Sequence, residues 1–317
     1  MSDTYFEILR PGINTTIQDE GRNHLYHIGI TISGAMDQRI FKLSNALVDN
    51  DLNEGALEFA YQGPLLKLIN GSINFAVTGD VNFKILRKNS IVEEGKCFQS
   101  YYLENEDQID IISVKNSVFG YLAIQGGFKI DKVWGSYSIN TKAKIGPNNG
   151  EKFSVDEKIN VKKSKVQKFI KKKIDYKYSL EKIIRVIKGT NYNYFSEEAK
   201  NKFFTEEFLV TNLSDRMGMR LKGPKLENIV NVNIKSEGLV KGVVQVPADG
   251  NPIMLFSDHG TIGGYPKMAV VIAADYDRVV QLTPGSKIKF KEVSLNEAEK
   301  FFKSYFNETT NYIAQIK

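Results

Sequence analysis

Short apolar or alternating runs separated by turn-forming residues dominate the first half of the chain. The clearest of these runs are Leu65–Ile69, Ile73–Val77, Asn82–Leu86, Ile109–Val114 and Val118–Ile124. Asn70-Gly71, between the first two, is a strong hairpin signal because both residue types tolerate the positive φ angles of a two-residue loop. Strands at this spacing, without long helices between them, predict an all-β barrel or sandwich.

The second half shows the same texture, with a few helices marked by their capping residues. A strand is predicted at 183–189, and the near-continuous apolar run Met268–Ala273 predicts a buried strand. Asp37 is placed to cap a helix that runs to about residue 48, and Ser196 precedes two glutamates that favour a helix N-terminus. A mainly β fold with a few helices follows.

The C-terminus predicts an amphipathic helix. Ser294 and Glu297 have the spacing of a capping box. The apolar stripe that follows consists of Ala298, Phe301, Phe302, Tyr305 and Phe306. Such a stripe is more typical of core or partner contact than of a membrane anchor.

Composition narrows the class of protein. The chain has 317 residues, of which 42% are hydrophobic and 25% charged, as in ordinary globular proteins. No apolar run approaches the roughly 20 residues that a membrane span needs, and the N-terminus lacks the pattern of a signal peptide. We therefore expect a cytoplasmic protein without membrane association. The single cysteine, Cys97, excludes an intrachain disulfide and a cysteine-rich metal site.

The net charge of +6 comes largely from a lysine-rich segment between residues 158 and 177. Its lysines alternate with aliphatic side chains rather than with a repeated aromatic platform, which favours a solvated connector over a nucleic-acid surface. The predicted division is a first half over 1–160, a basic connector over 161–180 and a second half over 181–317.

A glycine-rich segment after residue 250 carries the most suggestive chemistry. Gly263 and Gly264 lack a Cβ atom, so we expect positive φ angles there and N–H groups turned toward an oxyanion. Asp258 stands before these glycines and Lys267 after them. Taken alone, the segment is more typical of a plain turn between strands.

Four further motifs contain polar residues at short spacing. They are Gln18-Asp19-Glu20-Gly21-Arg22, Ser33–Asp37, Ser214-Asp215-Arg216-Met217-Gly218-Met219-Arg220 and Gln281-Leu282-Thr283-Pro284-Gly285. Asp19 alone is compatible with a polar turn, and Arg22 with a planar contact to a carboxylate or phosphate. Arg216 and Arg220 are equally compatible with a site and with surface ion pairs worth under about 1 kcal/mol each.

Together with Asp258-His259-Gly260-Thr261-Ile262-Gly263-Gly264-Tyr265-Pro266, these motifs resemble the C subunit of ATP-dependent bacterial 5-oxoprolinase. The same unit forms part of the carboxyltransferase of biotin-dependent urea carboxylase. The resemblance implies two cyclophilin-like β-barrels, with strands that can exchange between them. The site residues we assign from it are Asp258, Gly263, Gly264 and Tyr265 for catalysis and Gln18, Asp19, Arg22, Asp37, Arg216, Arg220, Gln245, Lys267 and Gln281 for binding.

The resemblance implies that 5-oxo-L-proline is opened to L-glutamate by a complex with the A subunit and the KipI-like B subunit of 5-oxoprolinase, driven by ATP with Mg²⁺. One alternative is a subunit of a biotin-dependent carboxyltransferase that acts on urea or a related amide. Biotin would be required only in this alternative. Another is a regulatory protein that sequesters a kinase-inhibitor partner. Polar side chains with glycine loops suit the orientation and polarisation of a ring amide carbonyl.

Several other mechanisms lack their motifs. There is no P-loop, no Gly-x-Ser-x-Gly elbow and no Ala-Met-Lys-Met biotin-carrier sequence. His24 and His27 lack further ligands nearby in sequence, so we expect no metal site. His259 has acid–base chemistry but ranks below Asp258. Tyr137 and Glu151 replace arginines of the family, which leaves open whether the substrate differs.

Overall fold

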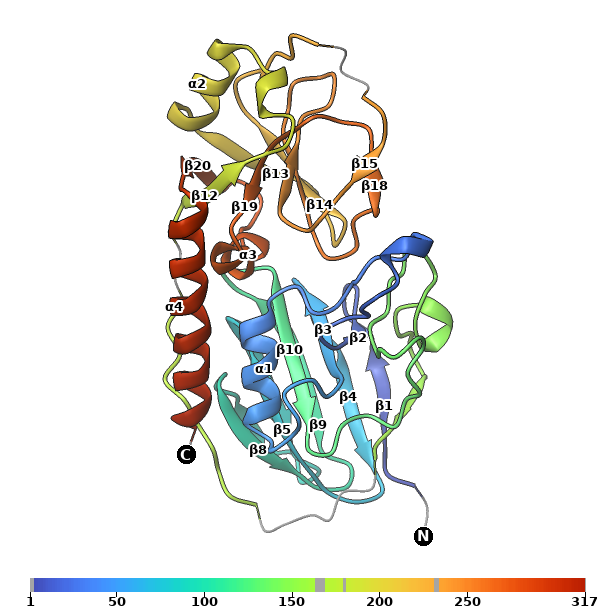
Figure 1. Cartoon of the computed structure of the whole chain (residues 1–317). Helices are drawn as coiled ribbons and strands as arrows, with labels where there is room; N and C mark the ends of the chain where they lie inside the picture. The colour runs from blue at the N-terminus through green and yellow to red at the C-terminus, as the bar shows by residue number, and fades with distance from the viewer. Residues whose placement is uncertain (1–2, 163–168, 179–180, 231–233, 317) are drawn as a thin grey trace. The chain divides into compact units, whose positions relative to one another are not determined.

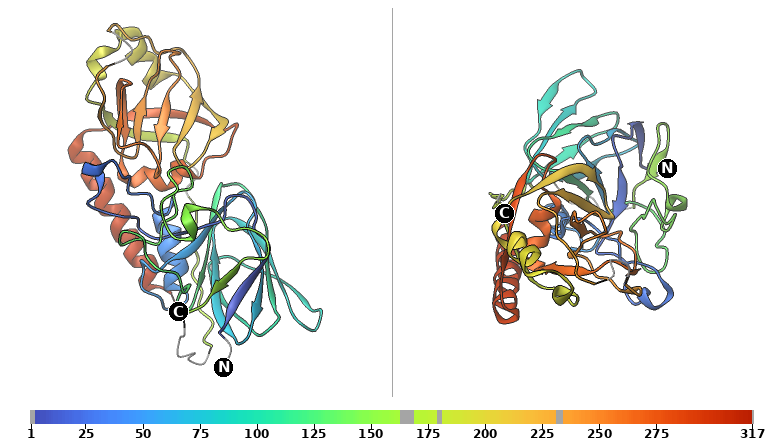
Figure 2. Two further views of the ribbon diagram at one scale, coloured as in Figure 1. Left: turned by 90° about the vertical axis from the view of Figure 1, so that its right-hand side faces the viewer. Right: turned by 90° about the horizontal axis from the view of Figure 1, so that it is seen from above.

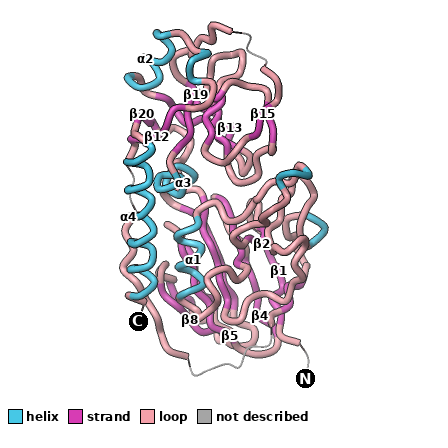
Figure 3. Tube along the Cα trace, in the orientation of Figure 1, coloured by secondary structure: helices cyan, strands magenta, loops and turns pink. Residues whose placement is uncertain are grey.

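The computed structural model describes residues 3–162, 169–178, 181–230 and 234–316. Strands predominate over helices (Figure 3), as predicted. The chain divides into two compact units. The first consists of Met1–Arg22, Ser33–Lys177 and Thr309–Lys317, and the second of Asn23–Ile32 and Tyr178–Glu308.

This division departs from the predicted one in three places. Asn23–Ile32 belongs to the second unit although residues on both sides of it belong to the first. The predicted connector 161–180 belongs to the first unit as far as Lys177, except that residues 163–168 and 179–180 lie outside the described part. The last residues of the chain, from Thr309, also belong to the first unit.

The described residues of the first unit form two antiparallel sheets and a helix, and the last residues of a further helix, from Thr309, also belong to this unit (Figure 1). The six-stranded sheet has the order β11 (Lys158–Asn160), β1 (Tyr5–Arg10), β4 (Leu65–Ile69), β9 (Gln108–Val114), β6 (Val81–Leu86) and β7 (Val92–Glu94). The five-stranded sheet has the order β2 (Thr16–Gln18), β3 (Ala56–Ala60), β10 (Phe119–Ile124), β5 (Ile73–Thr78) and β8 (Gln99–Leu103). A short 3₁₀ turn lies at Asn148–Gly150.

The two sheets share one hydrophobic core. In the six-stranded sheet, strands such as β1 bury every second side chain. In the five-stranded sheet, β3, β5 and β10 are buried along their whole length. Phe6 and Phe83 from the first sheet and Phe59 and Phe75 from the second are members of it. Helix α1 (Gln38–Ala46) covers the five-stranded sheet, where Phe41 meets Tyr121 of β10 edge to face with 5.9 Å between ring centroids.

The predicted hairpin at Asn70-Gly71 is wrong, although the turn itself is present. Asn70 and Gly71 both have positive φ angles. The two strands that they connect, β4 and β5, belong to different sheets and do not pair with each other. Both strands have apolar residues to bury, and crossing between sheets places them on opposite sides of one core.

The second unit is built on a closed barrel (Figure 2). Its order is β12 (Ile183–Lys188), β19 (Lys267–Val271), β16 (Val243–Gln245), β17 (Ile253–Leu255), β14 (Gly218–Lys222), β13 (Phe208–Ser214) and β20 (Lys287–Glu292). β12 and β20 pair in parallel and close the barrel. A separate ribbon pairs β15 (Glu237–Gly238) with β18 (Ile262–Gly263). The mainly β class is thus confirmed, with one closed barrel in the second unit and two sheets in the first.

Three helices accompany the barrel: α2 (Glu197–Thr205), α3 (Ala273–Val280) and α4 (Leu295–Ala314), with 3₁₀ turns at Tyr26–Ile28 and Tyr192–Tyr194. Ser196 caps α2, and Ser294 with Glu297 forms the predicted capping box of α4. The predicted strand Met268–Ala273 ends earlier, because Ile272 is the N-cap of α3, a helix that sequence analysis missed. The last residues of α4 pack in the first unit, where Tyr312 meets Tyr176.

Candidate functional site

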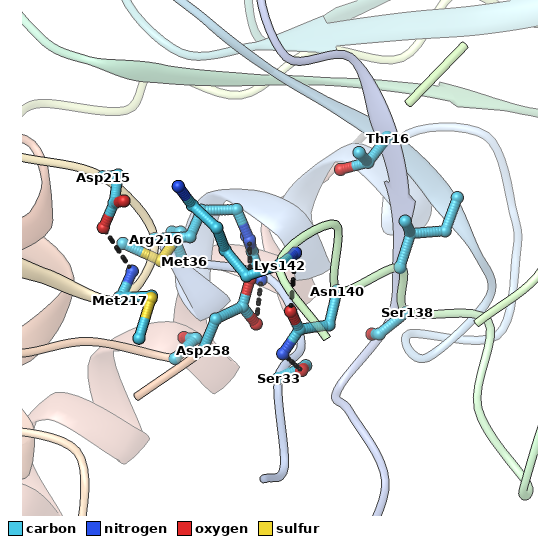
Figure 4. Close-up of polar contacts among 12 residues, drawn as sticks. Thr16, Ser33, Met36, Ser138, Asn140, Lys142, Asp215, Arg216, Met217 and Asp258 are labelled. Atoms are coloured by element: carbon cyan, nitrogen blue, oxygen red, sulfur yellow. Dashed lines mark hydrogen bonds and ion pairs between the residues drawn. The ribbon is translucent and has the colours of Figure 1, made fainter. Parts of the chain in front are cut away.

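The second unit contains a buried ion pair between two of the predicted site residues. Arg216 Nε and Nη2 donate to the two carboxylate oxygens of Asp258 at 2.8 and 3.2 Å (Figure 4). The side chains are only 6% and 2% exposed. The Asp258 N–H also donates to the Arg216 carbonyl oxygen at 2.9 Å, which locks the two loops together. For Arg216 the surface ion pair considered from sequence is therefore wrong.

A tight turn before β14 presents Arg216. The Asp215 carboxylate accepts hydrogen bonds from the Met217 and Gly218 N–H groups at 2.8 and 3.3 Å (Figure 4). Such an Asx-type turn fixes the backbone of Arg216, which lies between Asp215 and Met217. The Phe256 N–H donates to the Met217 carbonyl oxygen, so the segment leading to Asp258 runs alongside this turn.

Next to the ion pair lies an open pocket of about 470 Å³. β13, β14, β17 and the loop after Phe256 form its wall. Its polar lining comprises Asn212, Ser214, Asp215, Arg220 and His259. Arg220 is exposed on the outward face of β14, so its guanidinium is available to a carboxylate ligand. The pocket therefore joins a cation, hydroxyl and amide groups and an imidazole in one unit.

His259 lines the pocket, yet it is buried, with only 2% of its surface exposed. Its Nδ1 lies 2.6 Å from the Gly260 carbonyl oxygen and its Nε2 lies 3.0 Å from the Tyr26 hydroxyl. Burial lowers the pKa of the imidazole below its ordinary value, against the raising effects of the Gly260 carbonyl and Asp258. The ring is thus neutral at pH 7.

The expected oxyanion cradle is not built as predicted. Gly263 and Gly264 have no positive φ angle. Gly263 instead pairs with Glu237 in the β15–β18 ribbon. An added Cβ would lie 2.8 Å from Leu239 Cδ1 and 3.1 Å from Gln245 Nε2, so the ends of these two side chains would have to shift. Close packing, not backbone freedom, is the physical reason for this glycine.

Gly263→Ala should therefore lower the free energy of unfolding by about 1–3 kcal/mol, as overpacking does. Gly260→Ala is the matched control, because the nearest atom to its added Cβ is 3.4 Å away. We expect the control to change stability by less than about 0.5 kcal/mol in urea unfolding. Equal stabilities of the two variants would contradict the packing explanation.

Gln245, Tyr265 and Lys267 lie beside the ribbon of β15 and β18, whereas Gln281 lies at the end of α3. Gln245 Nε2 donates to the Tyr265 carbonyl oxygen at 3.1 Å, while the Tyr265 side chain is 41% exposed. Lys267 is buried and pairs with Glu237, whose pKa is lowered chiefly by the hydrogen bond from Lys267. Gln281 is buried at the C-cap of α3. None of these residues is among those that line the pocket.

The first unit gathers another set of predicted residues around the loop 136–138. The Asp19 carboxylate accepts hydrogen bonds from Gly21 N–H, Ser136 Oγ, Ser138 Oγ and Tyr137 N–H, at 2.6 to 2.8 Å. Arg22 donates to the Ser138 carbonyl oxygen, and Gln18 Nε2 to that of Ile139 at 2.8 Å. These contacts hold the loop in place.

Asp37 caps α1, accepting from the Ile40 N–H at 3.2 Å, as predicted. Its own N–H donates to the Tyr121 hydroxyl at 2.9 Å, which donates to Glu58 Oε2 at 2.6 Å. Burial and the neighbouring Glu58 raise the pKa of Tyr121 well above its ordinary value. Asp37 thus belongs to a buried network behind the helix.

Lysines lie beside Tyr137 and Glu151, the two positions at which the resemblance implies arginines. Lys162 Nζ donates to the Tyr137 hydroxyl at 2.9 Å and lies 4.9 Å from its ring centroid, and Lys132 Nζ lies 4.7 Å from that centroid. Glu151 pairs with Lys144. Cations are therefore present beside Tyr137, supplied by residues outside its own loop.

Within the described ranges, no three His, Cys, Asp or Glu side chains gather as a metal site, and His24 and His27 are exposed. No helix in the described part of the chain has the length and apolar character to cross a membrane.

Sequence reasoning missed Tyr26, Glu58 and Lys162. Tyr26 and Lys162 act through partners more than 20 residues away in sequence, so no local pattern marked them. Glu58 is the one charged residue in the otherwise apolar strand β3. A single charge in such a run indicates a buried polar contact, and this signal was available in the sequence.

The fold and these motifs define a carboxyltransferase-domain protein. The family model "Carboxyltransferase domain, subdomain A and B" matches residues 28–292, and the chain belongs to this family. It is 32% identical over 294 residues to the C subunit of 5-oxoprolinase from Escherichia coli K12, covering 93% of each chain. It is also 32% identical to the C subunit of 5-oxoprolinase from Haemophilus influenzae, covering 98% of this chain and 97% of that one.

A solved structure shares the fold over almost the whole chain. The urea amidolyase of K. lactis superposes with a TM-score of 0.88 and 26% identity, covering 98% of this chain and 20% of that one. The chain thus corresponds to one part of that much longer protein.

Proposed function

We propose that this protein is a subunit of an ATP-dependent 5-oxoprolinase that opens 5-oxo-L-proline to L-glutamate together with its A and B subunits. The observation that carries the proposal is the 32% identity along nearly the whole length of two chains named as the C subunit of 5-oxoprolinase. The match covers 93% and 97% of those two relatives, but only a fifth of the urea amidolyase. The protein is active in the complex, and its cytoplasmic location stays a prediction.

The pocket of the second unit supplies the groups that this substrate requires. 5-Oxoproline carries a carboxylate beside a ring amide. Arg220 is the carboxylate anchor, and Asn212 and Ser214 offer hydrogen bonds to the amide. The buried Arg216–Asp258 pair fixes the loop that forms one wall. We assign ATP and its Mg²⁺ to the assembled complex, since Mg²⁺ is held mainly by substrate phosphates with one or two carboxylates.

The test combines the purified chain with the A and B subunits and measures ATP hydrolysis and glutamate formation with 5-oxoproline. Arg220→Ala should raise KM for 5-oxoproline about 10- to 100-fold, the value of a charge-assisted hydrogen bond. Lys222→Ala is the matched control, because Lys222 is exposed on the same face of β14 and does not line the pocket. An unchanged KM in Arg220→Ala would refute the pocket assignment, and a wild-type complex without turnover would refute the function.

The family model and the K. lactis similarity favour a second candidate, a subunit of a biotin-dependent carboxyltransferase that acts on urea or a related amide. Avidin separates the two, because it blocks a biotin-dependent reaction and leaves 5-oxoproline opening unaffected. Stable binding to the B subunit without turnover would instead support the regulatory binding protein.

A further inference from the structure

We propose that Tyr26 and His259 form a proton relay at the pocket, in which the Tyr26 hydroxyl passes a proton between ligand or water and His259 Nε2. This inference rests on the proposed function, because it assigns a role in the same pocket. Of the two residues His259 lines the pocket, and Tyr26, which is half-buried, contacts it from the segment Asn23–Ile32 of the same unit.

The hydrogen bonds of His259 determine where its proton lies. A carbonyl oxygen only accepts, so the 2.6 Å contact with the Gly260 carbonyl oxygen places the hydrogen on Nδ1. Nε2 of the neutral ring then carries a lone pair, and the Tyr26 hydroxyl at 3.0 Å donates to it. The arrangement resembles that of a hydroxyl activated by an oriented imidazole.

Further contacts hold the pair. The Thr31 hydroxyl donates to the Ser257 carbonyl oxygen at 3.1 Å, which ties Asn23–Ile32 to the segment before His259. The Tyr26 and His259 rings have centroids 6.1 Å apart. Two charged groups act on the imidazole: Asp258 raises its pKa, whereas Lys241 lowers it, as the larger effect of burial does.

The relay conserves protons. A ligand or water molecule gives a proton to the Tyr26 oxygen while the hydroxyl proton moves to Nε2, which leaves Tyr26 as a phenol and His259 as an imidazolium. The imidazolium then donates to the Gly260 carbonyl through Nδ1 and to the Tyr26 oxygen through Nε2. The reverse transfer returns the proton to a leaving nitrogen. Because burial raises the pKa of Tyr26, its hydroxyl stays protonated between transfers.

The test uses the full chain alone and in complex. Long-range nitrogen NMR of the three histidines should show His259 with hydrogen on Nδ1 and with a pKa below the ordinary value of a histidine. Tyr26→Phe should shift the Nε2 resonance of His259 and leave those of His24 and His27 in place. Hydrogen on Nε2, or no shift in Tyr26→Phe, would overturn the proposal.

In the complex, His259→Gln and Tyr26→Phe should each lower kcat at least about 10-fold with little change in KM. A neutral base is required, so wild-type activity falls as pH drops through the His259 pKa, and His259→Gln should abolish this acid limb. His27→Gln, on the same segment as Tyr26, should behave as wild type in assembly and turnover. If His259→Gln and Tyr26→Phe assemble and keep the wild-type kcat and pH profile, the relay is refuted and the proposed function stands. Absent wild-type turnover refutes the function, and the nitrogen spectra then decide the proton arrangement.

Discussion

Asp258→Ala is expected to lower the free energy of unfolding of the second unit by about 3–5 kcal/mol. The substitution leaves the buried Arg216 guanidinium without the two carboxylate oxygens at 2.8 and 3.2 Å. Removing one partner of a buried pair strands the other charge in a poorly solvated place. Urea unfolding, with hydrogen exchange of the β14 and β17 amides as a local readout, measures the loss.

Two matched variants isolate the cause. The double variant Arg216→Met, Asp258→Leu should cost less than the sum of the single substitutions, because no unpaired charge remains. Glu207→Ala breaks an exposed pair with Lys287, 3.5 Å apart, and should cost no more than about 1 kcal/mol. If Asp258→Ala were as mild as Glu207→Ala, the buried pair would not be the structural support that we describe.

Asp19→Ala is the second large effect, and it concerns the first unit. We expect a loss of at least about 3 kcal/mol, because hydrogen bonds to a charged group are worth about 1.5–3 kcal/mol each. The substitution removes the acceptor of two hydroxyl and two N–H groups at once. Urea unfolding of the full chain measures the loss.

Ser136→Ala serves as the graded control for this prediction. It removes one of the four hydrogen bonds to the Asp19 carboxylate and also the bond that the Ser136 hydroxyl accepts from the Ser138 N–H at 3.0 Å, so the expected loss is about 1–2 kcal/mol. Equal transitions of Asp19→Ala and wild type in urea would show that the loop is held by other contacts. The result also decides whether Asp19, predicted as a binding residue, acts first as a support.

Capping residues and apolar spacing were readable from the sequence. Asp37, Ser196 and Ser294 each begin a helix, since a cap needs only its own side chain and an N–H group three residues on. The alternation in β4 and β9 likewise reflects one chain segment facing a core. These features depend on neighbours within about four residues, which the sequence displays directly.

Partners distant in the chain were decided by the tertiary structure. Asn70-Gly71 has the turn chemistry of a hairpin, yet the core places its strands in different sheets. Gly263 has the freedom for a positive φ, yet strand pairing with Glu237 fixes an extended backbone. Sequence cannot choose between such outcomes, because the deciding energy lies in contacts made only after the sheets have formed.

The site shows the same separation. By itself the sequence determined a mainly β chain, the starts of α1, α2 and α4, and the motifs that contain Asp258, Arg216 and Arg220. Only the tertiary structure paired Arg216 with Asp258 and left Arg220 facing the pocket, and only it brought Tyr26 to His259 across 233 residues. The physical reason is that closure of the barrel and the docking of Asn23–Ile32 fix which side chains share a buried, weakly screened space, and no local propensity encodes that choice.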